Sequence, residues 1–527
     1  MQHYALTVDK FLDHAAKWFD QNLVIEADAG QSHRRMTYAQ LRARSNRLSG
    51  ALLALGLGFG DRIGTLAWNT LDHVAVYYAT MGVGMVCHTL NPRLTHAHLA
   101  AIINAAGDRV LAVAADLLPI VRAVLPSCPC IAQIIVLDRC PGAEECTGLQ
   151  PVPVWALDAL IEAHGADTVW GQFDEQAPAG LCFTSGTTGR PKGVVYTHRS
   201  NYLHTLQTMQ ADVFALTARD VVLLGVPMFH ANGWGLPFSA PAAGARLVLP
   251  GRAMDGASLA RLMRDEGVTV AVGVQTIWLG LVDHLESTGD SLPALQRVLI
   301  GGSTCPDALI ARMEARLGAY VQTSWGMTEL SPLGTVAPPS KGALHGAGSG
   351  RPPVGVDLQL TDAAGITLPV QRGVMGHLKV RGASVIDRYF DDDTRVLDDQ
   401  GWFDTGDLAM IDADGNLTIC GRAKDLIKSG GEWINPTEME TIIGRHPAIR
   451  HVAVIGRADD KWGERPVLIV ERHDRTDAVH GLVDLLRGQV ADWWLPDRVV
   501  DIDTMPLAAS GKIDKTRLRA DYAAGLL

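Results

Sequence analysis

Short apolar runs rich in β-branched residues alternate with helical segments along most of the chain. The clearest runs fall at residues 221–226, 247–249, 268–274 and 297–300. Such runs are typical of parallel strands buried on both faces, and their alternation with helices predicts an α/β protein. Because 527 residues are too many for one core, we expect several domain-sized units.

The pattern changes after about residue 350, where glycines, aspartates and short alternating strands become frequent. We therefore predict a small β-rich subdomain over residues 350–422, which completes an N-terminal domain of residues 1–422. Residues 423–527 are predicted to form a small α+β domain, with Asn435 as a helix N-cap and Pro436 at the first helical position. The short charged link, residues 422–425, suits a hinge, although a rigid loop fits it equally well.

Composition narrows the class of protein. The net charge of −11 argues against a nucleic-acid partner. The start of the chain lacks the features of a signal peptide, and the longest apolar run, residues 74–87, is too short to span a bilayer and fits a helix followed by a strand. Eight cysteines in so long a chain do not make a disulfide scaffold. We expect a cytoplasmic protein with no transmembrane segment.

The segment 184–193 has the composition of a polyanion-binding loop. Its ten residues include three glycines, four hydroxyl side chains and two cations, and they follow a strand-like apolar run. Backbone N–H groups, hydroxyls and a lysine suit the phosphates of a nucleotide triphosphate. The loop is not a Walker A motif, because Pro191 and Gly193 stand where that motif requires a glycine and a hydroxyl. A solvated hairpin remains the alternative.

Other segments offer complementary groups. Within residues 322–329, Trp325 could stack on a purine and Glu329 could hold Mg²⁺ beside phosphates. In residues 402–407, Asp407 could accept hydrogen bonds from two ribose hydroxyls, and in residues 506–513 a glycine-bearing loop presents Lys512. Taken alone, residues 322–329 are more typical of core and loop than of a site, residues 402–407 are typical of a turn, and a lysine such as Lys512 is usually only solvated.

Together and in this order, and with residues 36–41 near the start, these segments resemble the adenylate-forming superfamily, which includes acyl-CoA synthetases, adenylation domains of peptide synthetases and luciferases. The resemblance covers nearly the whole chain. It implies a large N-terminal domain of parallel-sheet α/β subdomains with a small β-rich subdomain, followed by a small mobile α+β domain. It also implies ATP and Mg²⁺ as cofactors, CoA as co-substrate and, from relatives only, a homodimer.

The resemblance implies roles for named residues of the nucleotide site. The loop that holds the β- and γ-phosphates would use Thr184, Ser185, Gly186, Thr187, Thr188, Gly189 and Lys192. The adenine slot would be formed by Gly302, Ser303, Gln322, Thr323, Ser324 and Trp325. Thr184 and Glu329 would bind Mg²⁺, and Thr328 would touch the α-phosphate.

Further roles fall on the C-terminal part. The resemblance places Asp407 and Arg422 at the ribose and Lys424 at the hinge. Lys428 and Trp433 would approach the nucleotide or the CoA channel, and Lys512 would be the catalytic lysine that enters the site for adenylation.

The acid pocket is expected around His230, although an isolated histidine beside apolar residues is often an ordinary core residue. The resemblance assigns substrate contacts to His230, Trp234, Gly301, Gly302 and Met327. No aspartate occurs between residues 229 and 234, where amino-acid-activating domains typically carry one. The pattern is closest to fatty-acyl-CoA and 3-methylmercaptopropionate-type ligases, in which a tryptophan at the position of Trp234 can gate the acyl tunnel. Aromatic acids remain open.

These observations predict an ATP-dependent acyl-CoA ligase that works through an acyl-adenylate and releases AMP and pyrophosphate. The alternatives are a stand-alone adenylation enzyme that loads a carrier protein, and a non-catalytic nucleotide-binding protein. His377 departs from the family, which often has glutamate at this position; we expect it to affect the β-rich subdomain more than the chemistry.

Overall fold

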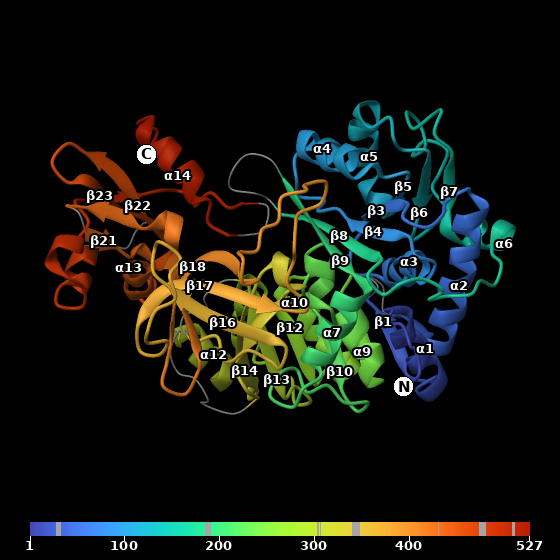
Figure 1. The fold of residues 1–527 in the computed structure, drawn as a ribbon, viewed down its shortest axis with the longest axis horizontal. Coiled ribbons are helices and arrows are strands. Elements are labelled where there is room, and N and C mark those ends of the chain that lie inside the picture. Colours follow the sequence, from blue (N-terminus) through green and yellow to red (C-terminus); the bar gives the residue numbers. More distant parts are fainter. Residues whose placement is uncertain are drawn as a thin grey trace.

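Two largely parallel sheets form the N-terminal part of the molecule (Figure 1). The computed structural model describes residues 1–527 apart from 28–32, 185–190, 303–304, 306, 340–347, 431, 474–480 and 509–511. The strands of the first sheet, in spatial order, are β7 (Val154–Ala156), β6 (Gln133–Val136), β5 (Val110–Val113), β3 (Arg62–Leu66), β4 (Val86–Thr89), β8 (Pro178–Thr184) and β9 (Lys192–Thr197). Those of the second are β15 (Leu333–Val336), β14 (Tyr320–Gly326), β13 (Arg297–Gly301), β12 (Val270–Val274), β10 (Val221–Leu224), β11 (Arg246–Leu249), β1 (Leu23–Glu26) and β2 (Arg34–Thr37).

The prediction of parallel strands is confirmed, with antiparallel pairing confined to strands at the sheet edges. Strands β9, β2 and β15 each pair antiparallel with their neighbour. The apolar run at residues 74–87 becomes a buried helix followed by strand β4, as expected. Among the helices that the structure describes, none combines the length and apolar character that a membrane crossing requires.

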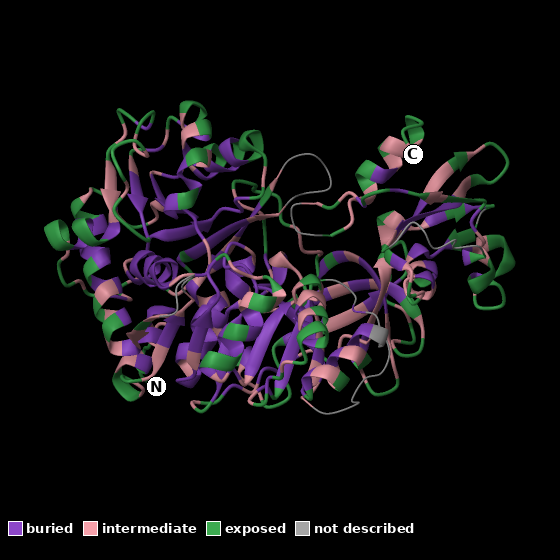
Figure 2. Ribbon diagram, turned by 180° about the vertical axis from the view of Figure 1, so that it is seen from behind, coloured by how far each residue is buried: buried purple, intermediate pink, exposed green. Residues whose placement is uncertain are grey.

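Helices cover both faces of the two sheets, which explains why the parallel strands are apolar throughout. Helices α1 (Asp9–Trp18), α3 (Leu71–Gly82) and α9 (Leu236–Ala243) share one core with the inner faces of the sheets. The first sheet also packs against α2 (Tyr38–Ala54), α4 (His96–Ala106), α5 (Leu118–Val124) and α6 (Leu157–His164). The second packs against α10 (Gly256–Glu266), α11 (Gln275–Thr288) and α12 (Asp307–Leu317). Helix α7 (His198–Thr208) follows β9. Figure 2 shows the resulting buried interior.

The predicted β-rich unit is an antiparallel sheet. Its strands are β16 (Val356–Thr361), β17 (Met375–Gly382), β18 (Phe403–Ile411) and β19 (Leu417–Arg422). Gly415 adopts a φ of +89° in the turn between β18 and β19, where glycine carries no steric cost. This sheet packs its own core against Tyr196 and Trp325, so it is joined to both large sheets.

The C-terminal part forms a separate sheet with its own cores (Figure 1). The elements are β20 (Ile427–Ser429), β21 (Glu432–Ile434), α13 (Pro436–Ile443), β22 (Ile449–Asp459), β23 (Gly463–Arg472), β24 (Arg498–Asp501) and α14 (Lys515–Ala523). Asn435 caps α13, since its side chain accepts from the Thr437 backbone N–H at 3.1 Å, as the sequence predicts. The α/β class with a small α+β C-terminal unit is thus confirmed, whereas the domain boundary at residues 422 and 423 stays a prediction.

Candidate active site

The polyanion-binding segment begins and ends on a hairpin. Thr184 ends β8 and Lys192 begins β9, and these two residues are paired across the hairpin. The Thr184 hydroxyl donates to the Lys192 carbonyl at 3.4 Å. The predicted phosphate-contacting residues between them, Ser185, Gly186, Thr187, Thr188 and Gly189, lie outside the described residues. The hairpin therefore fixes where the loop starts and ends, and its role stays a prediction.

Glu329 lies in a 3₁₀ turn, residues Thr328–Leu330, directly after β14 and is only 8% exposed. The Tyr389 hydroxyl donates to its Oε1 at 3.1 Å, and the Tyr196 hydroxyl donates to the Thr328 carbonyl at 3.0 Å. Burial, and then the charge of Glu329, raise the pKa of Tyr389, so its hydroxyl stays protonated and donates. A buried carboxylate is thus held in a defined orientation.

The surroundings of Glu329 fit a magnesium ion that shares its coordination with phosphates. In the described part of the chain, no hydrogen bond reaches Oε2 of Glu329, and no group of three or more His, Cys, Asp or Glu side chains could form a metal cage. Magnesium bound with nucleotides needs only one or two carboxylates, because water and phosphate oxygens fill the other positions. The donor set therefore suits Mg²⁺ beside a nucleotide.

Asp407 is buried between the large sheets and the C-terminal unit. Its Oδ2 accepts from the Trp325 indole N–H at 3.0 Å, and its Oδ1 lies 2.9 Å from Arg422 Nε. Burial raises the pKa of Asp407, whereas the Arg422 guanidinium lowers it. Trp325 is itself only 9% exposed, so its indole positions the carboxylate that we expect to meet the ribose.

Lys512, about a hundred residues further along the chain, lies near enough for its charge to interact with those of Asp407 and Arg422. Burial among protein atoms and the nearby Arg422 lower the pKa of Lys512, while Asp407 opposes that shift. The residue is nevertheless exposed to solvent. The Ala508 backbone N–H donates to the Lys512 carbonyl at 2.7 Å, and Leu507 bridges to Ile513. These two contacts hold the lysine just before α14.

His230 precedes an unusual turn, residues Ala231–Trp234 (α8). Ala231, Asn232 and Trp234 have φ values of +40°, +54° and +54°, and the glycines on either side of Trp234 are also left-handed. Each non-glycine residue in this conformation costs about 1–2 kcal/mol, and such strain tends to occur at functional sites. Burial, with Arg93 and Lys512 nearby, lowers the pKa of His230 to about 4, so the imidazole is neutral at pH 7.

The strained turn places Trp234 against the end of β13. A Cβ atom at Gly301 would lie 3.0 Å from the Trp234 ring and 2.5 Å from Ser324 Oγ, and one at Gly302 would lie 3.8 Å from the same ring. Gly302 also has a φ of +86°. The absence of side chains at these two glycines therefore leaves room for the indole, so that Trp234 lies against the end of β13, where the acid pocket is predicted.

Most described side chains of the predicted adenine slot form hydrogen bonds to neighbouring backbone carbonyls. Gln322 is fully buried and donates to the Val213 and Ala337 carbonyls at 2.9 and 2.8 Å. Thr323 and Ser324 donate to the carbonyls of Gly348 and Ile300, and Ser303 lies outside the described residues. These side chains brace the neighbouring loops. Contacts with a nucleotide would come from the backbone of β14 and from Trp325, and Met327, half-buried at its end, completes this edge.

Three residues predicted for the site, Lys424, Lys428 and Trp433, make their contacts within the C-terminal part. The Lys428 ammonium lies 5.4 Å from the Trp433 ring, and Trp433 is 53% exposed. Their hairpin, β20–β21, lies well away from β8 and β9 (Figure 1). Lys424 lies in a 3₁₀ turn, and its neighbour Asp425 pairs with Arg519 of α14 at 2.7 Å. We therefore expect Lys428 and Trp433 to meet a nucleotide only in another placement of the C-terminal unit.

Tyr389 and Arg93 were not among the residues predicted for the site from the sequence. Tyr389 lies in a stretch rich in aspartate and arginine that carries none of the motifs, and Arg93 follows Asn91 and Pro92 in a loop after β4. Arg93 lies 5.9 Å from the Phe229 ring. No signal in the sequence linked either residue to a site, because their partners lie far away along the chain.

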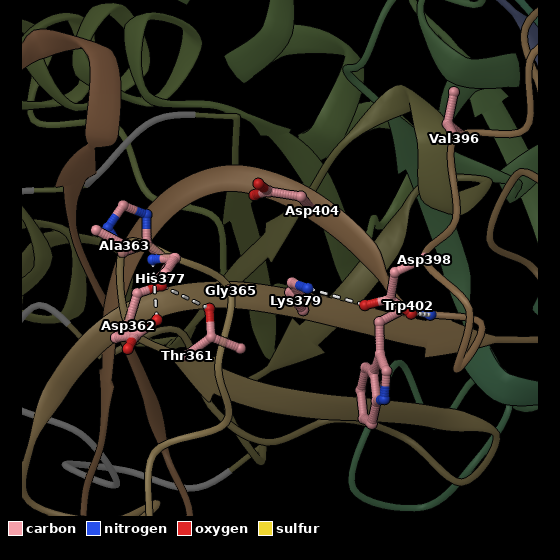
Figure 3. A pocket seen from close by; sticks show the side chains of 11 residues that line it. Thr361, Asp362, Ala363, Gly365, His377, Lys379, Val396, Asp398, Trp402 and Asp404 are labelled. Carbon is pink, nitrogen blue, oxygen red and sulfur yellow. Dashed lines mark hydrogen bonds and ion pairs between the residues drawn. The ribbon is translucent and has the colours of Figure 1, made fainter.

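A cavity of about 290 Å³ lies elsewhere, on the outer face of β17 (Figure 3). Its lining includes His377, Trp402 and the Lys379–Asp398 ion pair, whose atoms lie 2.8 Å apart. None of the candidate site residues lines it. His377, the departure noted in the sequence, therefore faces a surface of the β-rich unit.

Comparison with known proteins identifies two matching family models. The model described as AMP-binding enzyme matches residues 11–390, and the model described as AMP-binding enzyme C-terminal domain matches residues 438–512. The chain is 41% identical to 3-methylmercaptopropionyl-CoA ligase of Ruegeria lacuscaerulensis, over 99% of this chain and 98% of that protein. It is 40% identical to medium-chain-fatty-acid–CoA ligase of Ectopseudomonas oleovorans, over 100% and 98%.

The solved structures include ATP-bound MatB from Rhodopseudomonas palustris. It superposes with a TM-score of 0.83 at 26% identity, over 97% of this chain and 99% of that one. The agreement extends over both the large sheets and the C-terminal unit.

Proposed function

Because the chain belongs to the AMP-binding enzyme family, we propose that it is a ligase of fatty, medium-chain or thioether acids, and that it joins them to CoA through an acyl-adenylate. The enzyme is an acid–thiol ligase that uses ATP, Mg²⁺ and CoA. The relatives named above act on 3-methylmercaptopropionate and on medium-chain fatty acids. The observation that carries the choice of acid is the apolar closure of Trp234 over Gly301, beside a neutral His230.

The first step forms the acyl-adenylate. A carboxylate oxygen of the acid attacks the α-phosphorus of ATP, and the bond to the pyrophosphate oxygen breaks. An anion thereby approaches a highly charged triphosphate, so positive charge must be supplied where negative charge develops. We assign this to Lys512, with Asp407 and Arg422 holding the ribose and the 184–193 loop holding the leaving pyrophosphate. Mg²⁺, when bound through Glu329 and Thr184, neutralises phosphate charge.

The second step transfers the acyl group to CoA. The thiol sulfur attacks the acyl carbonyl, AMP leaves with the bonding electron pair, and the thiol proton is lost to solvent. Since Lys428 and Trp433 lie away from the nucleotide site, we propose that the C-terminal unit rotates about residues 422–425 between the steps. This rotation withdraws Lys512 and presents the β20–β21 hairpin. The homodimeric state and the cytoplasmic location expected from the sequence stay predictions.

An AMP-release assay over a panel of acids with CoA tests the choice of acid. We expect kcat/KM to rise by about fourfold per added methylene until the pocket is filled, because each buried methylene is worth about 0.8 kcal/mol. Straight-chain and thioether acids of equal length should perform alike. Efficient turnover of aromatic acids only, or of acyl groups on a phosphopantetheinylated carrier but not on CoA, would contradict the proposal.

Replacing Trp234 with alanine extends the same test. Removal of the indole from Gly301 opens the closed side of the pocket, so the preferred chain length should increase while the activity on the shortest acids falls. Phe214, a buried aromatic of the same core, provides a control, since its replacement by leucine should leave the chain-length preference unchanged. An unchanged preference in the Trp234 variant would place the acyl chain elsewhere.

The pH dependence of adenylation follows from the lowered pKa values of Lys512 and His230. Lys512 acts in its protonated form, and its pKa is lowered, so activity should fall on the alkaline side at lower pH than an ordinary lysine would allow. Lys512→Arg, which stays charged, should move that fall to higher pH. His230, with a pKa of about 4, should cause no loss near pH 6.5. The pH profile of ATP–pyrophosphate exchange provides the measurement.

A further inference from the structure

Residues 386–390 form a short strap between two separate parts of the nucleotide site. At one end, the Ile386 backbone N–H donates to the Glu329 carbonyl at 3.0 Å. At the other end, the Phe390 backbone N–H donates to the Gly193 carbonyl on β9 at 2.7 Å. The strap therefore joins the turn that carries Glu329 to the hairpin that carries the 184–193 loop.

The Tyr389 side chain also connects the Glu329 turn with the hairpin. Its hydroxyl donates to Oε1 of Glu329 at 3.1 Å, and the Lys192 ammonium lies 4.6 Å from the centre of its ring. A cation at this distance from an aromatic face is attracted to it. One half-buried side chain thus contacts both the expected magnesium carboxylate and the lysine that ends the phosphate loop.

Packing around the strap keeps this geometry fixed. Phe390 meets Phe183 of β8 edge-on, with ring centroids 6.4 Å apart, and Phe183 in turn lies 5.2 Å from the buried His88 ring. A Cβ atom at Gly193 would lie 2.8 Å from Phe390 Cβ, so only glycine allows β9 to approach the strap this closely. The hairpin and the strap are therefore packed directly against each other.

We propose that Tyr389 is a positioning residue for adenylation: it orients the Glu329 carboxylate for Mg²⁺ and holds the Lys192 ammonium beside the phosphates. This inference rests on the proposed function, which takes Glu329 as the magnesium carboxylate. With Oε1 engaged by the hydroxyl, Oε2 is the oxygen left to face the metal. Without the hydroxyl, the carboxylate must lose rotational freedom each time the metal binds, and the metal affinity falls.

Tyr389→Phe removes the hydroxyl and keeps the ring. Binding of Mn²⁺, followed by electron paramagnetic resonance in the presence of α,β-methylene-ATP, should weaken by about tenfold, as expected for a lost hydrogen bond to a charged group. The half-saturating Mg²⁺ concentration for ATP–pyrophosphate exchange should rise by the same factor, while kcat at saturating Mg²⁺ changes by less than about threefold. Tyr389→Leu, which also removes the ring from Lys192, should raise the KM for ATP by a further factor of about three.

Controls separate this role from a loss of structure. Tyr202→Phe alters another partly buried tyrosine outside the site and should leave Mn²⁺ affinity unchanged. Glu329→Gln should weaken Mn²⁺ binding, and adding Tyr389→Phe to it should have no further effect. If Glu329→Gln binds Mn²⁺ more weakly but Tyr389→Phe binds it within twofold of the parent, the role of Tyr389 is wrong, while the proposed function is unaffected. Unchanged Mn²⁺ affinity in Glu329→Gln would instead overturn the metal assignment of the proposed function.

Discussion

Replacing Lys512 with alanine should lower carboxylate-dependent ATP–pyrophosphate exchange by about 10²–10³-fold, the usual effect of removing a group that stabilises charge in a transition state. Conversion of supplied acyl-adenylate and CoA to acyl-CoA should change by less than about threefold, since Lys512 has left the site by then in the proposed cycle. The asymmetry follows from the proposed cycle, in which Lys512, whose charge interacts with those of Asp407 and Arg422, moves out with the C-terminal unit after adenylation. Exchange of labelled pyrophosphate measures the first step, and thioester formation measures the second.

Two variants control this experiment. Lys461→Ala removes an exposed lysine of the same C-terminal unit and should leave both steps intact. The Lys461 ammonium lies over the ring of its neighbour Trp462, and its backbone N–H, which the substitution keeps, donates to Asp459. Lys512→Arg keeps the charge and should retain part of the exchange activity. Normal adenylation by the alanine variant would exclude the proposed role of Lys512, and equal loss of both steps would exclude its restriction to adenylation.

Much of the fold could be predicted because it depends on local sequence. The apolar runs became β10–β13, since a strand buried on both faces needs apolar side chains at every position. The cap of α13 was predictable because Asn435 and Pro436 act within one helical turn. The family motifs supplied the order of the site residues, although several of those residues lie outside the described chain.

Other features could not be predicted, because they depend on contacts between distant segments. Tyr389 and Glu329 are separated by sixty residues, and neither carries a signal that points to the other. The left-handed turn after His230 includes Ala231, Asn232 and Trp234, residues that seldom adopt positive φ. Only tertiary packing explains that conformation. Gln322 shows the converse, since its motif position suggested nucleotide contact whereas its side chain braces two buried carbonyls.

Replacing Asp407 with alanine should produce the second large effect, a rise in the KM for ATP of about 10²-fold, because two charge-assisted hydrogen bonds to the ribose hydroxyls are lost. The free energy of unfolding of the variant should also fall by about 1–3 kcal/mol, since the buried Trp325 indole N–H loses its acceptor. The carboxylate that we propose as the ribose ligand thus also holds the Trp325 indole and pairs with Arg422. Calorimetry of ATP binding and urea unfolding measure the two effects separately.

Asp407→Asn distinguishes these two roles within one side chain. The amide oxygen can still accept from Trp325, so most of the stability should return. The neutral amide offers one acceptor where the carboxylate offered two, and it no longer pairs with Arg422, so ATP affinity should stay at least about tenfold below that of the parent. Asp404→Asn, an exposed aspartate on the same strand, should affect neither quantity. Full recovery of ATP binding by Asp407→Asn would show that this residue acts only by supporting Trp325, and the ribose would then need another partner.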